Sequence, residues 1–301
     1  MKKMFLNINN LNSRNSWWNK INFQVRKVKS LILLCLTAAM GIATPSWAIE
    51  ADYAVFGDGD GVIYSIHTDG SLSWFQHSGR LNGVASWANA GKAVNVGQGW
   101  ANPIKVFSGG DGIIYAITSD GKLGWYRHDG RYTGTSLWAK NIFTQIGTGW
   151  HTFTHVFSAG NGIIYAITTD NRMLWYRHDG WLDGTNTWAS NSGTQIGVGW
   201  TFDKVFSGGN GVIYGVHNDG ALYWYRHKGW LKGVNNWASL SGKKIGDGWI
   251  FDQIFSGSDG LIYGVHNDGT LYWYRHKGWL SGENSWVSLS GKPIGSGWFV
   301  P

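Results

Sequence analysis

Residues 206–249 read FSGGNGVIYGVHNDGALYWYRHKGWLKGVNNWASLSGKKIGDGW, and residues 255–298 repeat this stretch with 34 of 44 positions identical. Looser copies begin at Phe56, Phe107 and Phe157. The phase is kept throughout, and a fixed period of 49 to 51 residues is the signature of a repeat architecture. We therefore divide the chain into repeats at approximately 54–100, 105–150, 155–200, 204–249 and 253–298.

Each repeat is predicted to form short strands separated by glycine turns. Asp-Gly or Asn-Gly pairs, such as Asn210-Gly211, suit turns that need a positive φ. In the third repeat a later turn reads Asp170-Asn171, and asparagine tolerates the same backbone region. The segments between the turns alternate from one face to the other, as strands do, and no segment has a sustained helical period.

Four short strands per repeat, five times over, predict an all-β fold: a five-bladed β-propeller of four-stranded antiparallel blades. A closed ring removes the exposed sheet edges that an open array would leave. The last repeat ends on Gly295-Ser296-Gly297-Trp298, whereas no G-x-G-W precedes the first repeat. We expect this C-terminal strand to pair with the N-terminal copy and so close the ring.

Residues 1–48 have the composition of a secretory signal peptide. They contain seven lysines and arginines and no acidic residue, and an apolar run (31–43) precedes the sequence PSWA, which ends at Ala48. This order is typical of a cleaved leader, and the apolar run is short for a bilayer span. We expect cleavage after Ala48, which would place residues 49–301 outside the cell or in a periplasm. A retained N-terminal anchor is the alternative, because the basic segment is long.

The mature domain is formally neutral. The chain has 25 basic and 18 acidic residues, and 25 − 7 = 18 basic residues remain once the leader is removed. The net charge of +7 is therefore no evidence for binding to nucleic acid or to a membrane surface. The leader also holds the only cysteine, Cys35, and a domain of this size can bury a core without disulfides.

The repeats offer little chemistry for catalysis. Glu50 and Glu283 are the only glutamates, whereas glycoside hydrolysis usually needs two carboxylates facing one bond. No serine lies in a G-x-S-x-G elbow. The repeated histidine lacks a second ligand at metal spacing, so a structural or ligand-contact role is favoured over a metal site. We predict no catalytic residue, metal or cofactor.

Tryptophan is the abundant functional group, and 18 of the 21 tryptophans follow residue 48. Two sets are predicted to fill the wedges between blades, because large apolar side chains suit such positions. One set lies in the third strand of each repeat, at Trp74, Trp125, Trp175, Trp224 and Trp273. The other closes each G-x-G-W, at Trp100, Trp150, Trp200, Trp249 and Trp298.

The loop before the fourth strand differs from these packing positions. In repeats three to five it reads R-H-x-G-W-L-x-G-x-N-x-W, with more polar and indole groups than packing requires. Indole rings can cover the apolar faces of a sugar, while amide, guanidinium and imidazole groups bond its hydroxyls. The candidate carbohydrate contacts are Arg177, His178, Trp181, Asn186 and Trp188, then Arg226, His227, Trp230, Asn235 and Trp237, then Arg275, His276, Trp279, Asn284 and Trp286.

The pattern G-x-N-x-W-A…I-G-x-G-W…V-F-S…G-x-I-Y-x-V-x-x-D-G-x-L-x-W-Y covers about residues 52–299 and resembles the tachylectin family of five-bladed propeller lectins. The resemblance implies one site per blade, between adjacent blades, for N-acetylglucosamine or N-acetylgalactosamine. It carries these sites to Trp87, Trp138, Trp188, Trp237 and Trp286, with an asparagine two residues earlier in the last three repeats. The first two repeats depart from the pattern, which puts their sites in doubt: Ala85 and Ser136 replace the asparagine, Arg80 and Arg131 replace the loop tryptophan, and Gln76 replaces the arginine.

These observations predict a secreted, monomeric, multivalent lectin for glycans that carry N-acetylhexosamine. A propeller whose top face binds a protein or peptide is one alternative, because fold alone does not decide function. An enzyme at the central channel is the other. It would need a polar group that breaks the repeat near the axis, and the sequence shows none strong enough.

Overall fold

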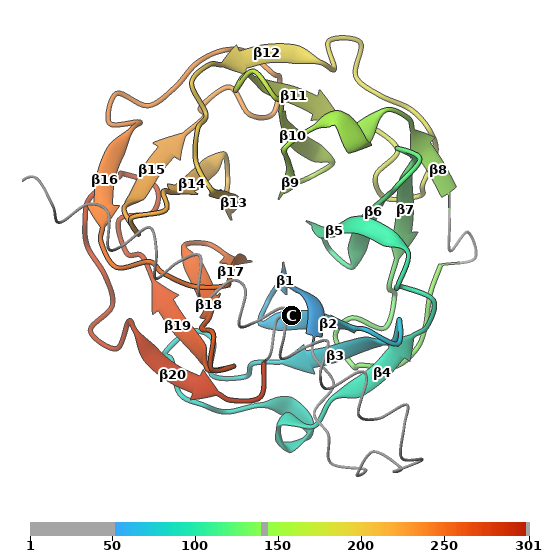
Figure 1. Ribbon diagram of the computed structural model, residues 1–301, viewed down its shortest axis with the longest axis vertical. Coiled ribbons are helices and arrows are strands. Elements are labelled where there is room, and N and C mark those ends of the chain that lie inside the picture. The colour runs from blue at the N-terminus through green and yellow to red at the C-terminus, as the bar shows by residue number, and fades with distance from the viewer. Residues whose placement is uncertain (1–51, 140–143, 299–301) are drawn as a thin grey trace, which may run out of the picture. The chain divides into compact units, whose positions relative to one another are not determined.

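The computed structural model describes residues 52–139 and 144–298, which form twenty strands in five antiparallel sheets of four. The sheets stand radially around a common axis as the blades of a propeller (Figure 1). The predicted fold class and blade count are confirmed. The predicted leader, residues 1–48, lies outside the described residues.

The first blade consists of β1 (Asp52–Gly59), β2 (Val62–His67), β3 (Leu72–Gln76) and β4 (Val94–Gly97). The second consists of β5 (Pro103–Gly110), β6 (Ile113–Thr118), β7 (Leu123–Arg127) and β8 (Thr144–Gly147). The third consists of β9 (His155–Gly160), β10 (Ile163–Ile167), β11 (Met173–Arg177) and β12 (Thr194–Gly197). The fourth consists of β13 (Lys204–Gly209), β14 (Val212–Val216), β15 (Leu222–Arg226) and β16 (Lys243–Gly246). The fifth consists of β17 (Gln253–Ser258), β18 (Leu261–Val265), β19 (Leu271–Arg275) and β20 (Lys292–Gly295).

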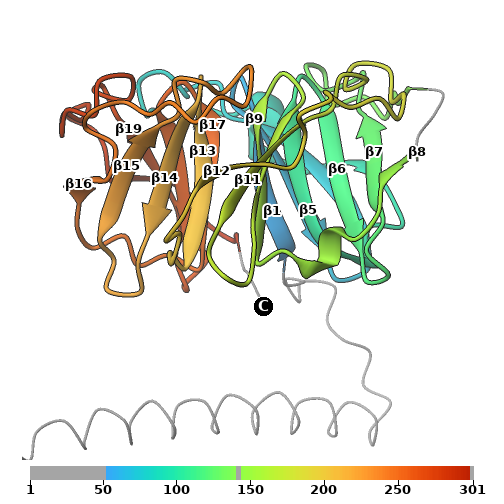
Figure 2. The same cartoon turned by 90° about the horizontal axis from the view of Figure 1, so that it is seen from above.

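Each blade is a simple meander whose first strand lies next to the axis and whose fourth strand lies at the rim (Figure 1). Because neighbouring strands are antiparallel, the hairpin between the first two strands and the loop before the fourth strand lie on the same face of the ring, as the side view shows (Figure 2). The hairpin turns use the predicted residues. The residue before the glycine has a φ of 50° to 54° at Asp60, Asp111, Asn161, Asn210 and Asp259.

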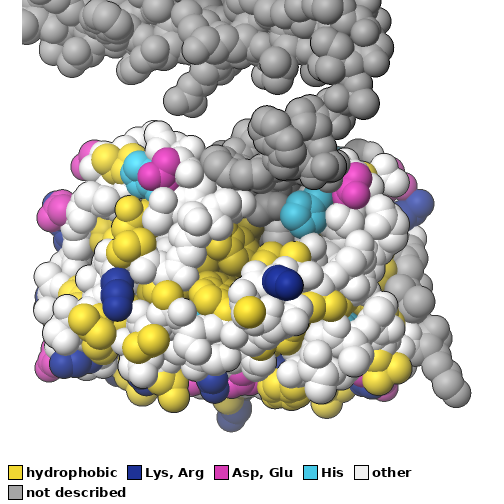
Figure 3. Space-filling view, turned by 90° about the horizontal axis from the view of Figure 1, so that it is seen from below, with side chains coloured by type: hydrophobic (Ala, Val, Ile, Leu, Met, Phe, Trp, Pro, Cys, Tyr) yellow, Lys and Arg dark blue, Asp and Glu magenta, His cyan; other side chains and the backbone are white. Residues whose placement is uncertain are grey.

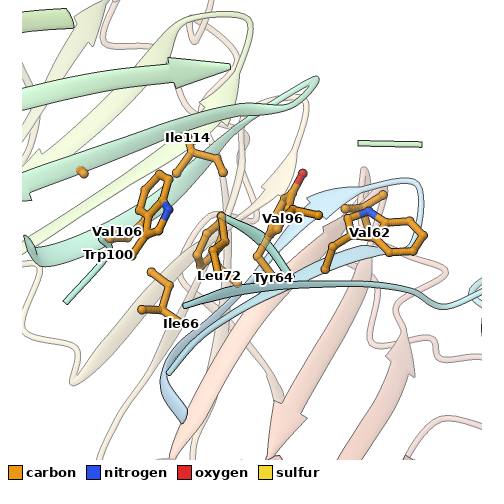
Figure 4. Close-up of a cluster of buried hydrophobic side chains, with 11 residues drawn as sticks. Val62, Tyr64, Ile66, Leu72, Val96, Trp100, Val106 and Ile114 are labelled. Carbon is orange, nitrogen blue, oxygen red and sulfur yellow. The ribbon is translucent and has the colours of Figure 1, made fainter. Parts of the chain in front are cut away.

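The hydrophobic core lies between blades rather than within them. One cluster joins Tyr64, Leu72 and Trp100 of the first blade to Val106 and Ile114 of the second (Figure 4). The predicted packing tryptophans are confirmed: those in the third strands are at most 3% exposed and those that close each G-x-G-W at most 6%. Burying one large side chain contributes about 1.5–3 kcal/mol, so these wedges hold the ring together.

The predicted closure of the ring is wrong. The last strand, β20, pairs with β19 inside the fifth blade, and the sheet of the first blade contains only β1 to β4. Each repeat is therefore a complete blade. The fifth and first blades meet through side chains, including a hydrogen bond from the Val55 backbone N–H to Gln253 Oε1 (2.8 Å). The sequence argument assumed an exchanged strand, but the wedge contacts alone suffice.

Candidate functional site

Every pair of neighbouring blades shares a buried histidine–tyrosine joint. The tyrosine hydroxyl of one blade lies 2.7–3.1 Å from Nδ1 of the histidine in the next blade. Nε2 of that histidine lies 2.7–2.8 Å from the carbonyl oxygen seven residues later. Because a carbonyl only accepts, Nε2 carries the proton in the neutral ring and Nδ1 accepts from the tyrosine. The pairs are Tyr64–His128, Tyr115–His178, Tyr165–His227, Tyr214–His276 and Tyr263–His77.

This joint removes the three predicted histidines from the ligand surface. His178, His227 and His276 are 0% exposed, and both ring nitrogens of each are hydrogen-bonded inside the protein. Their role is structural, which the sequence had left open. The cause is strand alternation: the histidine follows the third strand on the face that turns toward the preceding blade.

The predicted arginines also join blades. Nη1 of Arg226 and of Arg275 each donates to a leucine carbonyl in the following blade at 2.7 Å, and Arg177 makes the same contact at 3.5 Å. Arg177 also pairs with Asp179 at 2.9 Å. The guanidinium groups are partly exposed, but these bonds hold them on the face of the ring that carries the first hairpin of each blade and the loop before the fourth strand. We call this face the upper face.

The first loop tryptophans lie near the axis. A Cβ added to Gly162, Gly211 or Gly260 of the hairpin turn would lie 2.7–2.9 Å from the ring of Trp181, Trp230 or Trp279. Trp230 lines a cavity at the mouth of the central channel. The structure therefore separates these three residues from the second loop tryptophans, with which the sequence had grouped them.

Each second loop tryptophan lies at the rim between two blades, with its ring centroid 5.3–5.9 Å from that of the tryptophan that closes the preceding G-x-G-W. We call each of these five positions a cleft. The cleft between the third and fourth blades contains a cavity of about 200 Å³. Its lining residues are Gly197, Val198, Gly199, Trp200, Tyr225, Trp237 and Ser241. The centroid of the Trp200 ring lies 4.6 Å from that of Tyr225 and 5.7 Å from that of Trp237. The cleft thus has aromatic walls, and two of its lining residues, Tyr225 and Ser241, carry hydroxyl groups.

Trp237 is held firmly in this cleft. Its ring stacks on His227 with centroids 4.8 Å apart, and Nε1 donates to the carbonyl oxygen of Ile196 in the preceding blade at 2.9 Å. The same Nε1 lies 2.8 Å from Oδ1 of Asn235. The amide oxygen of Asn235 therefore faces the indole, and the Nδ2 group of this exposed residue stays available as a donor beside Trp237. Asn186 and Asn284 bond Trp188 and Trp286 in the same way, at 2.9 and 2.7 Å.

The sequence analysis missed the tyrosine in this cleft. Tyr225 follows the buried Trp224 and so lies on the opposite face of β15, half-buried against Trp200. Burial raises the pKa of Tyr225, so its hydroxyl stays protonated and can donate a hydrogen bond. Tyr176 and Tyr274 occupy the equivalent positions. The W-Y pair repeated in the sequence was the available signal.

The family model for Tachylectin matches residues 42–200 and again residues 181–300. The chain belongs to the tachylectin family. Among solved structures, a symmetrical protein from work on how folding constraints shape its de novo evolutionary emergence covers 79% of this chain and 94% of its own, with 22% identity and a TM-score of 0.52. That likeness concerns the fold alone. Prp20p from Saccharomyces cerevisiae covers 79% of this chain and 62% of its own, with 12% identity and a TM-score of 0.40. No curated protein matches the chain.

The five clefts of this tachylectin-family chain are not equally equipped. The clefts formed by Trp188, Trp237 and Trp286 each have the tyrosine, the asparagine and a serine four residues after the tryptophan. We call these three clefts complete. At the cleft between the fifth and first blades, Phe75 replaces the tyrosine and packs 4.6 Å from Trp298, and Ala85 replaces the asparagine. That cleft keeps its aromatic walls and loses polar groups. On the side of the ring that Figure 3 shows, hydrophobic and uncharged surface predominates, and charged and histidine side chains lie scattered over it.

A charged group does break the repeat near the axis, contrary to the sequence analysis. Asp58 stands where the other blades have Gly109, Ala159, Gly208 and Gly257. Its carboxylate is buried, accepts a hydrogen bond from Ser108 and lies 2.7 Å from Nη1 of Arg131, whose other nitrogen lies 2.8 Å from Asp60. Burial raises the pKa of Asp58 to about 6 although Arg131 opposes the shift.

This pair stabilises the one interface that lacks the arginine–leucine bond. Gln76 replaces the arginine at the boundary of the first and second blades, and Tyr132 replaces the leucine. Arg131 reaches back across the same boundary to the Asp58 carbonyl oxygen (3.1 Å) and carboxylate. The ion pair therefore has a sufficient structural role. It borders a cavity of about 460 Å³ at the channel mouth, to which all five blades contribute.

Within the described part of the chain, no group of three or more histidine, cysteine or acidic side chains is placed to hold a metal. The same residues include no helix that is long and apolar enough to cross a membrane.

Proposed function

We propose that this protein is a secreted, monomeric, multivalent lectin that binds one N-acetylhexosamine in each complete cleft between blades. The observation that carries the proposal is the rim cleft, with Trp200, Tyr225 and Trp237 as its walls and Ser241 among its lining residues. Aromatic rings suit the apolar faces of a sugar, and hydroxyl and amide groups suit its rim. Membership of the tachylectin family supports the same reading.

The size of the cleft favours a single sugar residue. Its volume of about 200 Å³ lies below the ~300–1,000 Å³ of sites for drug-sized ligands. A shallow site of this kind binds weakly by itself. Several sites on one rigid ring raise the avidity for a glycan-coated surface by ~10²-fold or more through effective concentration. We therefore propose agglutination of such surfaces, and binding without cleavage.

The test is calorimetric titration of residues 49–301 with N-acetylglucosamine and with N-acetylgalactosamine. A triple variant, Tyr176→Phe, Tyr225→Phe and Tyr274→Phe, removes one hydroxyl from each complete cleft. The fold accepts this change, because Phe75 is the native residue at the equivalent position. Each hydroxyl should contribute about 0.5–1.5 kcal/mol, so affinity should fall by ~2- to 12-fold.

Tyr223→Phe is the matched control, because Tyr223 lies on the same strand outside the cleft lining and packs against Phe202. It should bind like the native protein. If neither sugar gives binding heat, the lectin function is rejected. Equal affinities of the triple variant and the native protein would reject the assignment of the cleft.

A protein-binding propeller is the second candidate. The loops on the upper face expose one large side chain per blade around the channel mouth, with 40–60% of each accessible: Leu81, Tyr132, Leu182, Leu231 and Leu280. If this face is the functional one, free N-acetylhexosamine should not reduce attachment of the protein to a target cell. The double variant Leu182→Ser, Leu231→Ser should attach less than the native protein.

A further inference from the structure

The loop that ends each fourth strand contributes one variable residue to each cleft. This residue stands between the two glycines of G-x-G-W, and it is different in every blade: Gln98, Thr148, Val198, Asp247 and Ser296. All five are exposed, and Val198 is among the residues that line the cavity beside Trp200 and Trp237. The rest of the loop is repeated without change.

The structure explains why only the middle residue varies. A Cβ added to Gly197 would lie 2.5 Å from Nε1 of Trp200, and the other four first glycines meet their own tryptophan at 2.4–3.0 Å. The second glycine has a φ between 74° and 89° in all five blades, which side chains adopt only with strain. Both glycines and the tryptophan are therefore fixed by the fold, while the residue between them is free of packing constraints.

Two of these residues differ most in chemistry. Val198 is 68% exposed, so an aliphatic side chain stands unburied at the lip of an aromatic cleft. Asp247 places a carboxylate at the same position of the next cleft, paired with the exposed Lys244. An exposed ion pair of this kind is worth about 0–1 kcal/mol, so the carboxylate can exchange Lys244 for a ligand group.

We propose that the residue between the two glycines selects the substituent on the bound sugar, so that the clefts of one ring prefer different sugars. This inference rests on the proposed lectin function. The Val198 cleft takes an acetamido group, whose methyl covers the exposed valine. The Asp247 cleft binds N-acetylhexosamine more weakly than an unacetylated amino sugar, whose ammonium group faces the carboxylate.

The experiment reads each cleft separately. The indole N–H signals of Trp188, Trp237 and Trp286 in a ¹⁵N-labelled protein report on neighbouring clefts, because each indole donates to the strand at its own cleft. Titration with N-acetylglucosamine and with glucosamine gives a ratio of dissociation constants at each signal. We expect the ratio to favour the acetylated sugar at Trp237 and the free amine at Trp286.

A reciprocal exchange, Val198→Asp and Asp247→Val, tests the cause. Both variants should fold, because each introduces a residue that is native at an equivalent position. Loss of the burial of one methyl group should weaken binding by about fourfold. An exposed pair of ammonium and carboxylate is worth about 0–1 kcal/mol, which adds a factor of up to about five. The ratio at Trp237 should therefore move by on the order of tenfold in Val198→Asp, and the Trp286 ratio should move oppositely in Asp247→Val.

The Trp188 signal is the internal control, since its cleft has Thr148 and neither variant changes it. A ratio at Trp237 that is insensitive to Val198→Asp, or that moves equally at Trp188, would overturn the inference while leaving the lectin intact. If no indole signal responds to either sugar, the lectin function and this inference fail together.

Discussion

Acid should unfold this protein steeply, because each of the five joints contains a histidine that is buried in its neutral form. Burial lowers the pKa of His77, His128, His178, His227 and His276, and the carbonyl bond at Nε2 only partly opposes this. In the unfolded chain the same rings titrate near their ordinary pKa of about 6.5. Below that pH the unfolded state binds more protons than the folded state. The stability that the buried histidines contribute is therefore complete above pH 6.5 and is lost as the pH falls toward their folded pKa values.

The slope follows from the number of joints. Each histidine contributes about 1.4 kcal/mol per pH unit in this window, so five contribute about 7 kcal/mol per pH unit. Asp58 acts in the opposite direction, because burial raises its pKa to about 6 and the folded state keeps a proton that the unfolded state loses. Below pH 6 the net slope is therefore about 5.5 kcal/mol per pH unit. Because a domain is stable by only about 5–15 kcal/mol, this slope should be measurable as a loss of stability between pH 6.5 and the folded pKa values of the histidines.

Urea unfolding between pH 7.5 and 5, followed by tryptophan fluorescence, measures this slope. His178→Gln should lower the stability at pH 7.5 but should also reduce the slope by about a fifth, because one of five titrating joints is removed. His151→Gln, at an exposed position, is the control and should leave the slope unchanged. A free energy of unfolding that stays constant from pH 7 to 5.5 would refute the reasoning, as would a native slope in His178→Gln.

Three further predictions concern the contacts between blades and one turn. Tyr64→Phe leaves Nδ1 of the buried His128 without its donor and should lower the free energy of unfolding by about 1–3 kcal/mol in a denaturant titration; no change would contradict the joint. Gly233→Ala should be strongly destabilising, because its Cβ would lie 2.4 Å from the Trp175 ring, whereas Gly160→Ala, with a φ of 82° and open space around its Cβ, should cost only about 1–3 kcal/mol of backbone strain; equal losses in a denaturant titration would contradict the steric explanation. Arg131→Trp leaves Asp58 as an unpaired buried carboxylate and should destabilise the protein by about 3–5 kcal/mol, while adding Asp58→Gly recreates the residues at the boundary of the fourth and fifth blades, Gly208 and Trp279, and should restore most of the melting temperature; a double variant no better than the single one would show that the ion pair is not the cause.

The sequence was sufficient for the fold because the period, the Asn-Gly turns and the strand alternation are local features. Trp224 and Trp249 could be assigned to the core from their strand positions alone. The closure of the ring could not, because G-x-G-W at residues 295–298 reads the same whether its strand pairs with its own blade or with the first one. Only the pairing of β20 with β19 decides between them.

The candidate site was recovered in part, because a repeated loop shows which residues recur but not which neighbour each one meets. His227 and Trp237 are ten residues apart and stack on each other, yet one is a buried joint residue and the other borders a cleft. The partner that buries His227 is Tyr165, 62 residues earlier. The exceptional charge of Asp58 could have been predicted from the sequence, because the other four equivalent positions hold three glycines and an alanine.

The absence of an exchanged strand between described blades has a consequence for how such a chain can change in length. Every repeat brings a finished sheet and both halves of a joint, the tyrosine for one neighbour and the histidine for the other. Duplicating or losing a gene segment of one period therefore adds or removes a whole sector, with no half-built sheet left behind. The number of sectors is then limited by the angle at which wedges of this width close a circle, and not by the connectivity of the chain.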